Sequence, residues 1–223
     1  MKASLDTNVI IHLYRAEKQQ ILFQRFDEGV FIYEQIRQIE LQHHGQDILG
    51  KVDKDIIDNR IQLYTDQQLK NEGVFTLFQG YVKENRLLYG AGDLGEVYAI
   101  SLAETIGAYS LVTDDTKQGG PYMSLLQFPD NDIMPFTYAD VLIMNYLEGI
   151  FTSEETIQFF NDINSISDLN WSFKSQLTKF VKRFWSNPYQ DSEHKWMIHF
   201  CDKKGINARK KLKELLCIIS KFT

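Results

Sequence analysis

Short apolar runs alternate along most of the chain with segments whose apolar residues recur every three or four positions. The first apolar run ends at Asp6. Apolar residues at helical spacing follow it, namely Val9, Ile10, Leu13 and Tyr14. This pattern predicts a strand, a turn and a helix, with Asp6 at the carboxyl end of the strand.

Two later segments repeat this order of elements. Residues 30–33 form a continuous apolar run, and the helical pattern after them carries Glu40. Residues 109–113 are predicted to form another strand, which ends directly before Asp114 and Asp115. Strands that alternate with helices predict an α/β fold with a Rossmann-like parallel sheet that is flanked by helices.

The segments between these units give weaker patterns. We expect a loop and a polar helix over residues 51–64, and a short strand or the start of a helix over residues 73–78. Another short strand or turn is expected after residues 117–121. Two helices are predicted between residues 137 and 163, and the second of them begins at Ser153.

The C-terminal quarter of the chain differs from the rest in charge. Residues 1–170 carry 12 Lys and Arg against 26 Asp and Glu, a balance of −14, whereas residues 171–223 carry 12 against 4, a balance of +8. The charge changes at the polar stretch 165–170. We therefore predict one domain over residues 1–168 and a basic helical region over residues 169–223.

The basic region has two interpretations. Its cations and interleaved aromatic residues would contact RNA phosphates and stack on unpaired bases, or the aromatic residues would form a small helical core that docks a partner. The candidate RNA contacts are Lys203, Lys204, Arg209 and Lys210.

Composition limits the class of protein. Hydrophobic residues make up 43% of the chain and charged residues 24%, which is typical of a soluble globular protein. The sequence contains no membrane-spanning run and no signal-peptide pattern, so we expect a cytoplasmic protein without a membrane partner. The two cysteines, Cys201 and Cys217, indicate neither a disulfide framework nor a zinc site.

The acidic residues that follow the predicted strands suggest a site. In open parallel sheets, ligands bind at the carboxyl ends of the strands, where Asp6 and the pair Asp114 and Asp115 are expected. Carboxylates that crowd together stay ionised only if a cation neutralises them. Oxygen ligands suit Mg²⁺ or Mn²⁺, and such a metal ion favours hydrolysis of a phosphodiester.

Four segments together resemble the pattern of PIN-domain nucleases. They are SLDTNVII at the N-terminus, Glu40 on the following helix, GDLGEVYAISLA in the middle of the chain, and LVTDD. The resemblance covers roughly residues 1–165 and implies an Mg²⁺- or Mn²⁺-dependent endoribonuclease that leaves a 3′-hydroxyl and a 5′-phosphate. A longer insertion over residues 45–85 and the basic tail depart from the commonest relatives, so the RNA substrate is not inherited from them.

The resemblance also implies roles for individual residues. The candidate catalytic residues are Asp6, Glu40, Asp93, Glu96, Asp114 and Asp115. Of these, Asp6, Glu96 and one of Asp114 and Asp115 would hold the metal, with Glu40 and Asp93 directly or through water. Glu34 is a weaker candidate for the position given to Glu40. The candidates for binding substrate, holding the attacking water or orienting the carboxylates are Thr7, Asn8 and Thr113.

Each assignment has a structural alternative. Asp6 would cap the first helix, and Asp93 with Glu96 has the spacing of a capping box. Many PIN relatives are toxins of toxin–antitoxin pairs, which implies an antitoxin or inhibitor protein as a partner, and many are homodimers. Two other functions stay open: a catalytically inactive PIN-like module that binds RNA or protein, and a DNA-directed nuclease in phage defence.

Overall fold

The computed structural model describes residues 1–89, 94–128 and 131–222, so the predicted site residue Asp93 lies outside the described residues. The chain forms two compact units, which divide between Thr137 and Tyr138. The first unit contains the sheet, and the second consists of helices in its described part.

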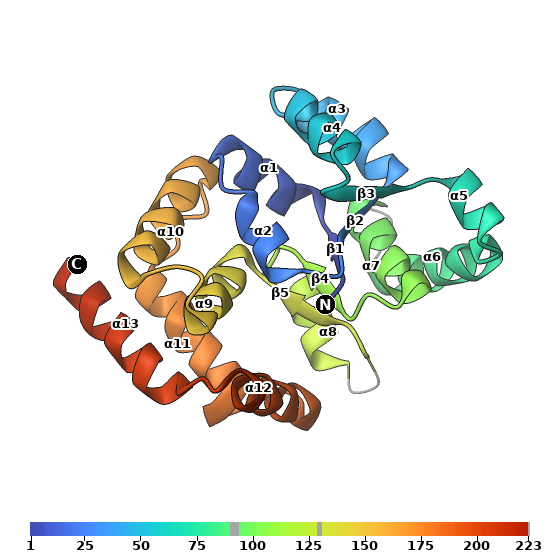
Figure 1. Cartoon of the computed structure of the whole chain (residues 1–223). Helices are drawn as coiled ribbons and strands as arrows, with labels where there is room; N and C mark the ends of the chain where they lie inside the picture. Colours follow the sequence, from blue (N-terminus) through green and yellow to red (C-terminus); the bar gives the residue numbers. More distant parts are fainter. Residues whose placement is uncertain (90–93, 129–130, 223) are drawn as a thin grey trace. The chain divides into compact units, whose positions relative to one another are not determined.

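In the described part of the first unit, the sheet has five strands, and every pair of neighbouring strands is parallel. The strands lie in the order β3-β2-β1-β4-β5 (Figure 1). Their bounds are β1 Ala3–Leu5, β2 Val30–Tyr33, β3 Ile61–Tyr64, β4 Ser110–Val112 and β5 Met134–Phe136. This arrangement confirms the predicted α/β class with an all-parallel, Rossmann-like sheet and flanking helices.

Helices connect these strands. Their bounds are α1 Thr7–Arg15, α2 Gln20–Arg25, the π-helix η1 Ile36–Glu40, α3 Leu41–His44, α4 Leu49–Ile57, α5 Asp66–Asn71, α6 Phe75–Tyr89, α7 Leu94–Ile106 and α8 Pro121–Gln127. None of the helices in the described part of the chain is long and apolar enough to cross a lipid bilayer.

Two predictions of secondary structure were wrong. Residues Ile61–Tyr64, which we assigned to a polar helix, form β3 because all four of them pair with the parallel strand β2. Residues Pro121–Gln127 form helix α8 instead of a short strand or turn, and Pro121 occupies the start of the helix, where its missing N–H costs no hydrogen bond.

Helix α7 is oriented so that its first turn lies at the carboxyl edge of the sheet. The helix packs against β1, β2 and β4. Its last carbonyl, that of Ile106, accepts a hydrogen bond of 3.4 Å from Nζ of Lys2, which precedes β1. Gly107 then ends the helix with a φ of +62°, and the chain enters β4 at the same edge. Glu96, in the first turn of α7, therefore lies toward the opposite edge.

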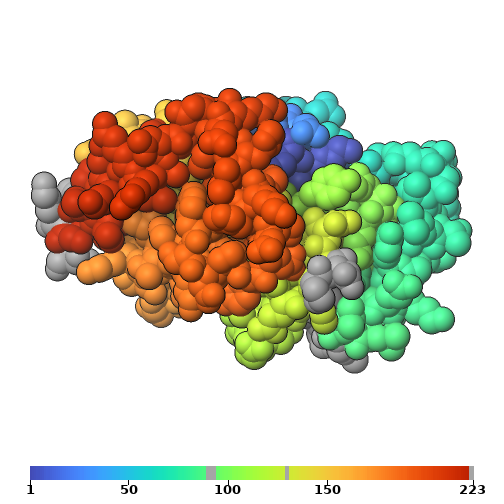
Figure 2. Space-filling model, turned by 90° about the horizontal axis from the view of Figure 1, so that it is seen from below, coloured from blue at the N-terminus to red at the C-terminus, as the bar shows by residue number. Residues whose placement is uncertain are grey.

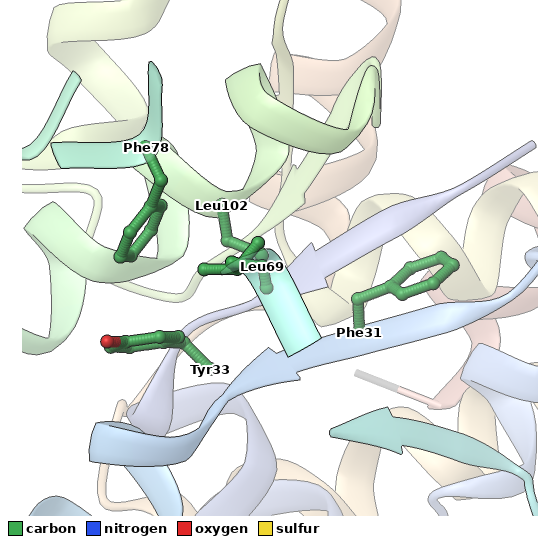
Figure 3. Close-up of a cluster of buried hydrophobic side chains, with 5 residues drawn as sticks. All are labelled: Phe31, Tyr33, Leu69, Phe78 and Leu102. Carbon is green, nitrogen blue, oxygen red and sulfur yellow. The ribbon is translucent and has the colours of Figure 1, made fainter. Parts of the chain in front are cut away.

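An apolar cluster lies between the sheet and helices α5, α6 and α7. Its buried members are Phe31, Tyr33, Leu69, Phe78 and Leu102 (Figure 3). Side chains alternate between the two faces of a strand, so Phe31 and Tyr33 of β2 both point to this face. The cluster holds α6 and α7 against the carboxyl half of β2.

The second unit begins earlier in the chain than the division at residue 168 that we predicted. Its helices are α9 Tyr138–Glu148, α10 Ser153–Ser167, α11 Phe173–Val181, the π-helix η2 Lys182–Ser186, α12 Asp191–Lys204 and α13 Ala208–Phe222. Helix α9 contacts α10, α11 and α13, which explains why it clusters with the C-terminal helices. Helix α10 is capped by Thr152, one residue before the predicted start, in a capping box with Glu155.

Aromatic residues form much of the interior of the second unit. Phe160 stacks on Phe173 with a centroid distance of 4.4 Å, and Tyr138 stacks on Trp171 at 5.4 Å. The guanidinium of Arg183 is buried and forms an ion pair with Glu193. These aromatic side chains pack as a helical core, which is one of the two interpretations of the tail.

Candidate functional site

Asp6 lies at the carboxyl end of β1, as predicted, and two groups hold its carboxylate. Oδ1 accepts a hydrogen bond of 2.7 Å from the backbone N–H of Thr7, and Oδ2 accepts one of 2.9 Å from the hydroxyl of Thr113. The backbone N–H of Asp6 also donates to the carbonyl of Val112 at 3.0 Å. Asp6 therefore caps α1 and is joined to the end of β4 as well.

Asp114 directly follows Thr113, a hydrogen-bond partner of Asp6. It contacts His12, which the sequence motifs did not single out. Nδ1 of His12 is 2.8 Å from Oδ2 of Asp114. The carboxylates of Asp6 and Asp114 are both buried, with residue exposures of 2% and 4%. One signal was available in the sequence, because His12 lies four residues after Asn8 and thus on the same side of the first helix.

Asp115 has a different environment from Asp114. Its backbone N–H donates to the hydroxyl of Thr113 at 3.2 Å, and its Oδ1 accepts from the backbone N–H of Lys117 at 3.0 Å. Its Oδ2 also forms an ion pair of 3.3 Å with Nζ of Lys117. These contacts shape the turn after β4, so Asp114 is the stronger candidate of the two for a ligand.

Glu96 is the third buried carboxylate at this end of the fold. It is 6% exposed and lies in the first turn of α7, where the positive end of the helix dipole favours a negative charge. The direction of α7 brings Glu96 to the edge of the sheet that carries Asp6 and Asp114.

The two glutamates after β2 differ in their surroundings. Glu40 is the last residue of η1 and is partly exposed, and η1 contacts both β2 and α7. The carboxylate of Glu34 accepts a hydrogen bond of 2.8 Å from the backbone N–H of Asp66 at the start of α5. This contact gives Glu34 a structural role and leaves Glu40 as the candidate at this position.

Thr7 and Asn8, the two polar candidates that follow Asp6, differ in how exposed they are. Asn8 is exposed, whereas the hydroxyl of Thr7 is buried and has no hydrogen-bond partner among the described residues. Buried hydroxyl groups normally have a protein or water partner. An unsatisfied hydroxyl next to Asp6 is therefore the kind of group that a bound water or substrate oxygen would satisfy.

The donors present are chemically suited to a divalent metal ion. Buried carboxylates and hydroxyl groups are oxygen ligands, which Mg²⁺ and Mn²⁺ prefer. However, no three His, Cys, Asp or Glu side chains among residues 1–89, 94–128 and 131–222 are grouped so that they could hold a metal ion. The structure thus brings Asp6, Thr113 and Asp114 together and leaves Glu40 and Glu96 as further donors from neighbouring elements.

The predicted cations of the basic region lie in the second unit. Lys204 forms an exposed ion pair of 3.4 Å with Glu148, and Lys210 pairs with Glu214 at 4.0 Å. Lys203 and Arg209 are exposed on α12 and α13. Exposed ion pairs of this kind contribute little to stability, so these cations are accessible to a polyanion.

The geometry defines an α/β protein with buried carboxylates at the carboxyl edge of a parallel sheet. No protein-family model matches the sequence, and comparisons with curated proteins and with solved structures find no match either. These comparisons therefore do not support the resemblance to PIN-domain nucleases, which comes from the sequence segments of this chain.

Proposed function

We propose that the protein is a metal-dependent endoribonuclease of the PIN-like type. One observation carries the proposal: Asp6 and Asp114, which are 108 positions apart, both lie buried at the carboxyl ends of the adjacent parallel strands β1 and β4. Ionised carboxylates in such a place need a positive counter-charge. Asp6 and Asp114 would hold Mg²⁺ or Mn²⁺, and Glu96 and Glu40 would be further donors, directly or through water.

The metal ion would supply a water of lowered pKa and would offset the negative charge that develops on the phosphate. The residues of the chain orient the ligands. Thr113 and the backbone N–H of Thr7 fix the two oxygens of Asp6, and His12 fixes Asp114. Partners of this kind set the orientation of a ligand and its affinity for metal. The hydroxyl of Thr7 is available to the attacking water.

The proposal is tested by cleavage of a fluorescently labelled single-stranded RNA by the purified protein in Mn²⁺. We expect cleavage that EDTA abolishes and that Asp6→Asn reduces by more than about 100-fold, since even partners of metal ligands contribute 10- to 100-fold. Asp58→Asn is the matched control, because Asp58 is an exposed carboxylate of the same unit. Single-stranded DNA of the same sequence tests the DNA-directed alternative.

One observation favours a second candidate function, a PIN-like module that binds RNA or protein without cleaving it. The carboxylates of the described residues do not form a group of three that could hold a metal ion. Metal-independent RNA binding without cleavage of either polymer would support this alternative. A role as the toxin of a toxin–antitoxin pair, with an inhibitor protein as partner, is a further part of the nuclease proposal and requires the cleavage activity.

A further inference from the structure

A cavity with polar and aromatic walls lies at the carboxyl edge of the sheet, next to the candidate metal site. It has a volume of about 510 Å³, which is within the usual range for small-molecule sites. Tyr33 and Gln35, at the end of β2, and Asp66, after β3, form one wall. Because β2 is the direct neighbour of β1, this wall lies one strand away from Asp6.

Aromatic rings packed against one another form much of the apolar part of the cavity. The ring centroid of Tyr33 is 4.7 Å from that of Phe78 and 5.1 Å from that of Tyr98. Figure 3 shows Tyr33 and Phe78 side by side at the carboxyl end of β2, with the Tyr33 hydroxyl directed away from Leu69 and Leu102. Tyr33 and Phe78 are almost fully buried, whereas Tyr98 is half-buried and presents an accessible ring.

The aromatic wall is held in place by a hydrogen bond. The hydroxyl of Tyr33 donates to Oδ1 of Asp66. Burial, together with this hydrogen bond, raises the pKa of Tyr33, so the phenol stays a neutral donor. The Asp66 carboxylate and the amides of Gln35 and Gln79 add hydrogen-bonding groups to the rim of the cavity.

Helix α6 contributes two cations to the same cavity. The residues of α6 that line it recur at helical spacing and form one face of the helix, namely Phe75, Phe78, Gln79, Val82, Lys83, Arg86 and Leu87. Lys83 and Arg86 are exposed, and α6 contributes to the surface on the right of Figure 2. The cavity thus combines an aromatic wall, hydrogen-bonding groups for a base edge and two cations for phosphates.

We propose that this cavity binds an unpaired base of the RNA strand, which stacks on Tyr98, while Lys83 and Arg86 contact the flanking phosphates. The proposal rests on the nuclease function proposed above and names a subsite for its substrate. Aromatic rings with nearby cations are the usual way to bind single-stranded nucleic acid. Asp66 disfavours a free anion in the cavity but accepts hydrogen bonds from the amino groups of bases.

The test measures the binding of fluorescein-labelled 12-nucleotide oligo(U) and oligo(C) to the full-length protein by fluorescence anisotropy, in EDTA so that no metal or cleavage contributes. Tyr98→Ala should weaken binding by about tenfold, and Tyr98→Phe should restore it. Lys83→Ala/Arg86→Ala should weaken binding and reduce the slope of log K against log salt by about 1.4. Thermal melting checks that each variant is folded.

Matched controls are available in the same unit. Tyr109→Ala removes a tyrosine that is 61% exposed and lies outside this cavity, and Lys51→Ala/Lys54→Ala removes two exposed cations of α4. Both should bind the oligonucleotides like the parent protein. The inference is overturned if the parent does not bind, if folded Tyr98→Ala binds like the parent, or if the controls lose affinity equally.

The binding assay separates this inference from the nuclease proposal. RNA binding that depends on Tyr98, Lys83 and Arg86, without cleavage in Mn²⁺, would keep the subsite and reject the nuclease. If the protein cleaves RNA in Mn²⁺ but replacement of Tyr98, Lys83 and Arg86 leaves RNA binding unchanged, the nuclease proposal stands and the subsite is rejected.

Discussion

His12 and Asp114 show how much of the candidate site depends on contacts between distant residues. Their side chains meet across 102 positions of sequence. The sequence identified Asp114 because it follows an apolar run. The four-residue spacing of Asn8 and His12 places the histidine on the Asn8 side of the first helix, but it does not assign Asp114 as its partner. The strand ends could be predicted from hydrophobic periodicity, whereas the second layer of contacts around the carboxylates could not.

Replacement of His12 tests its role as the positioning residue for Asp114. We expect His12→Ala to lower both the affinity for Mn²⁺ and the rate of RNA cleavage by about tenfold, because partners of metal ligands contribute 10- to 100-fold. Isothermal titration calorimetry and the cleavage assay measure the two effects. His43→Ala, which alters an exposed histidine of α3, is the control and should change neither quantity. Unchanged Mn²⁺ affinity in His12→Ala would reject the positioning role.

Tyr14 makes stability depend on pH in the alkaline range. Its hydroxyl is fully buried and donates to Asp55 at 2.6 Å. Burial, followed by this hydrogen bond, raises the pKa of Tyr14 above its ordinary value. Above about pH 10 the unfolded chain ionises this phenol while the folded chain keeps it protonated, so the free energy of unfolding falls as the pH rises.

Urea denaturation between pH 8 and pH 11 measures this dependence. Tyr14→Phe should be less stable than the parent at pH 8, because it removes the hydrogen bond, and should lose less stability as the pH rises. Tyr109→Phe is the exposed control and should follow the parent. Equal slopes for Tyr14→Phe and the parent above pH 10 would contradict the assignment.

A buried ion pair within the second unit provides another prediction at the level of single residues. Arg183 contacts Glu193 and lies 3.8 Å from Asp140, and the three side chains are at most 7% exposed. Arg183→Met should therefore cost about 3–5 kcal/mol of stability in urea denaturation, because it leaves buried carboxylates without their cation. Lys203→Met, on the surface of α12, should change stability by less than about 0.5 kcal/mol. A similarly small change in stability for Arg183→Met would show that the buried carboxylates do not need the Arg183 guanidinium.

Among the elements, those with strong patterns were predicted correctly and short ones at the edges were not. The strands β1, β2 and β4 lie within the predicted apolar segments because they are buried over their whole length. In β3 only Ile61 is buried, so its four residues carry no clear strand pattern and the parallel pairing with β2 decides their structure. Glycine and proline before α8 suggested a turn, although Pro121 in fact starts a helix.

Helix α7 is the element that brings Glu96 to the site, and its packing can be tested directly. Leu102 is fully buried in the cluster between α7 and the sheet. Leu102→Ala should cost about 2–5 kcal/mol of stability, because it removes buried apolar contacts and leaves a cavity. Urea denaturation measures this cost, with Ile57→Ala, 77% exposed on α4, as a control that changes stability by less than about 0.5 kcal/mol. Equal costs for both variants would show that α7 is not anchored there.

For the whole molecule, the sequence predicted a parallel α/β unit and a basic helical region that divide near residue 168, whereas the two compact units of the structure divide between Thr137 and Tyr138. The polar linker and the change of charge near residue 168 suggested that division. Helices α9 and α10 precede the linker, and the contacts of α9 with α11 and α13 group it with the basic helices. The change of charge along the sequence thus indicated a basic C-terminal region, while contacts between helices determine where the second compact unit begins.

We propose that Asp6 and Asp114 share a divalent metal ion at the carboxyl edge of the sheet. Anomalous diffraction from crystals soaked in Mn²⁺ tests it most directly, with crystals of Asp6→Asn as the control. We expect an anomalous peak in contact with both carboxylates in the parent protein and a lost or strongly weakened peak in the variant. Fully soaked parent crystals with no peak at these carboxylates would contradict it.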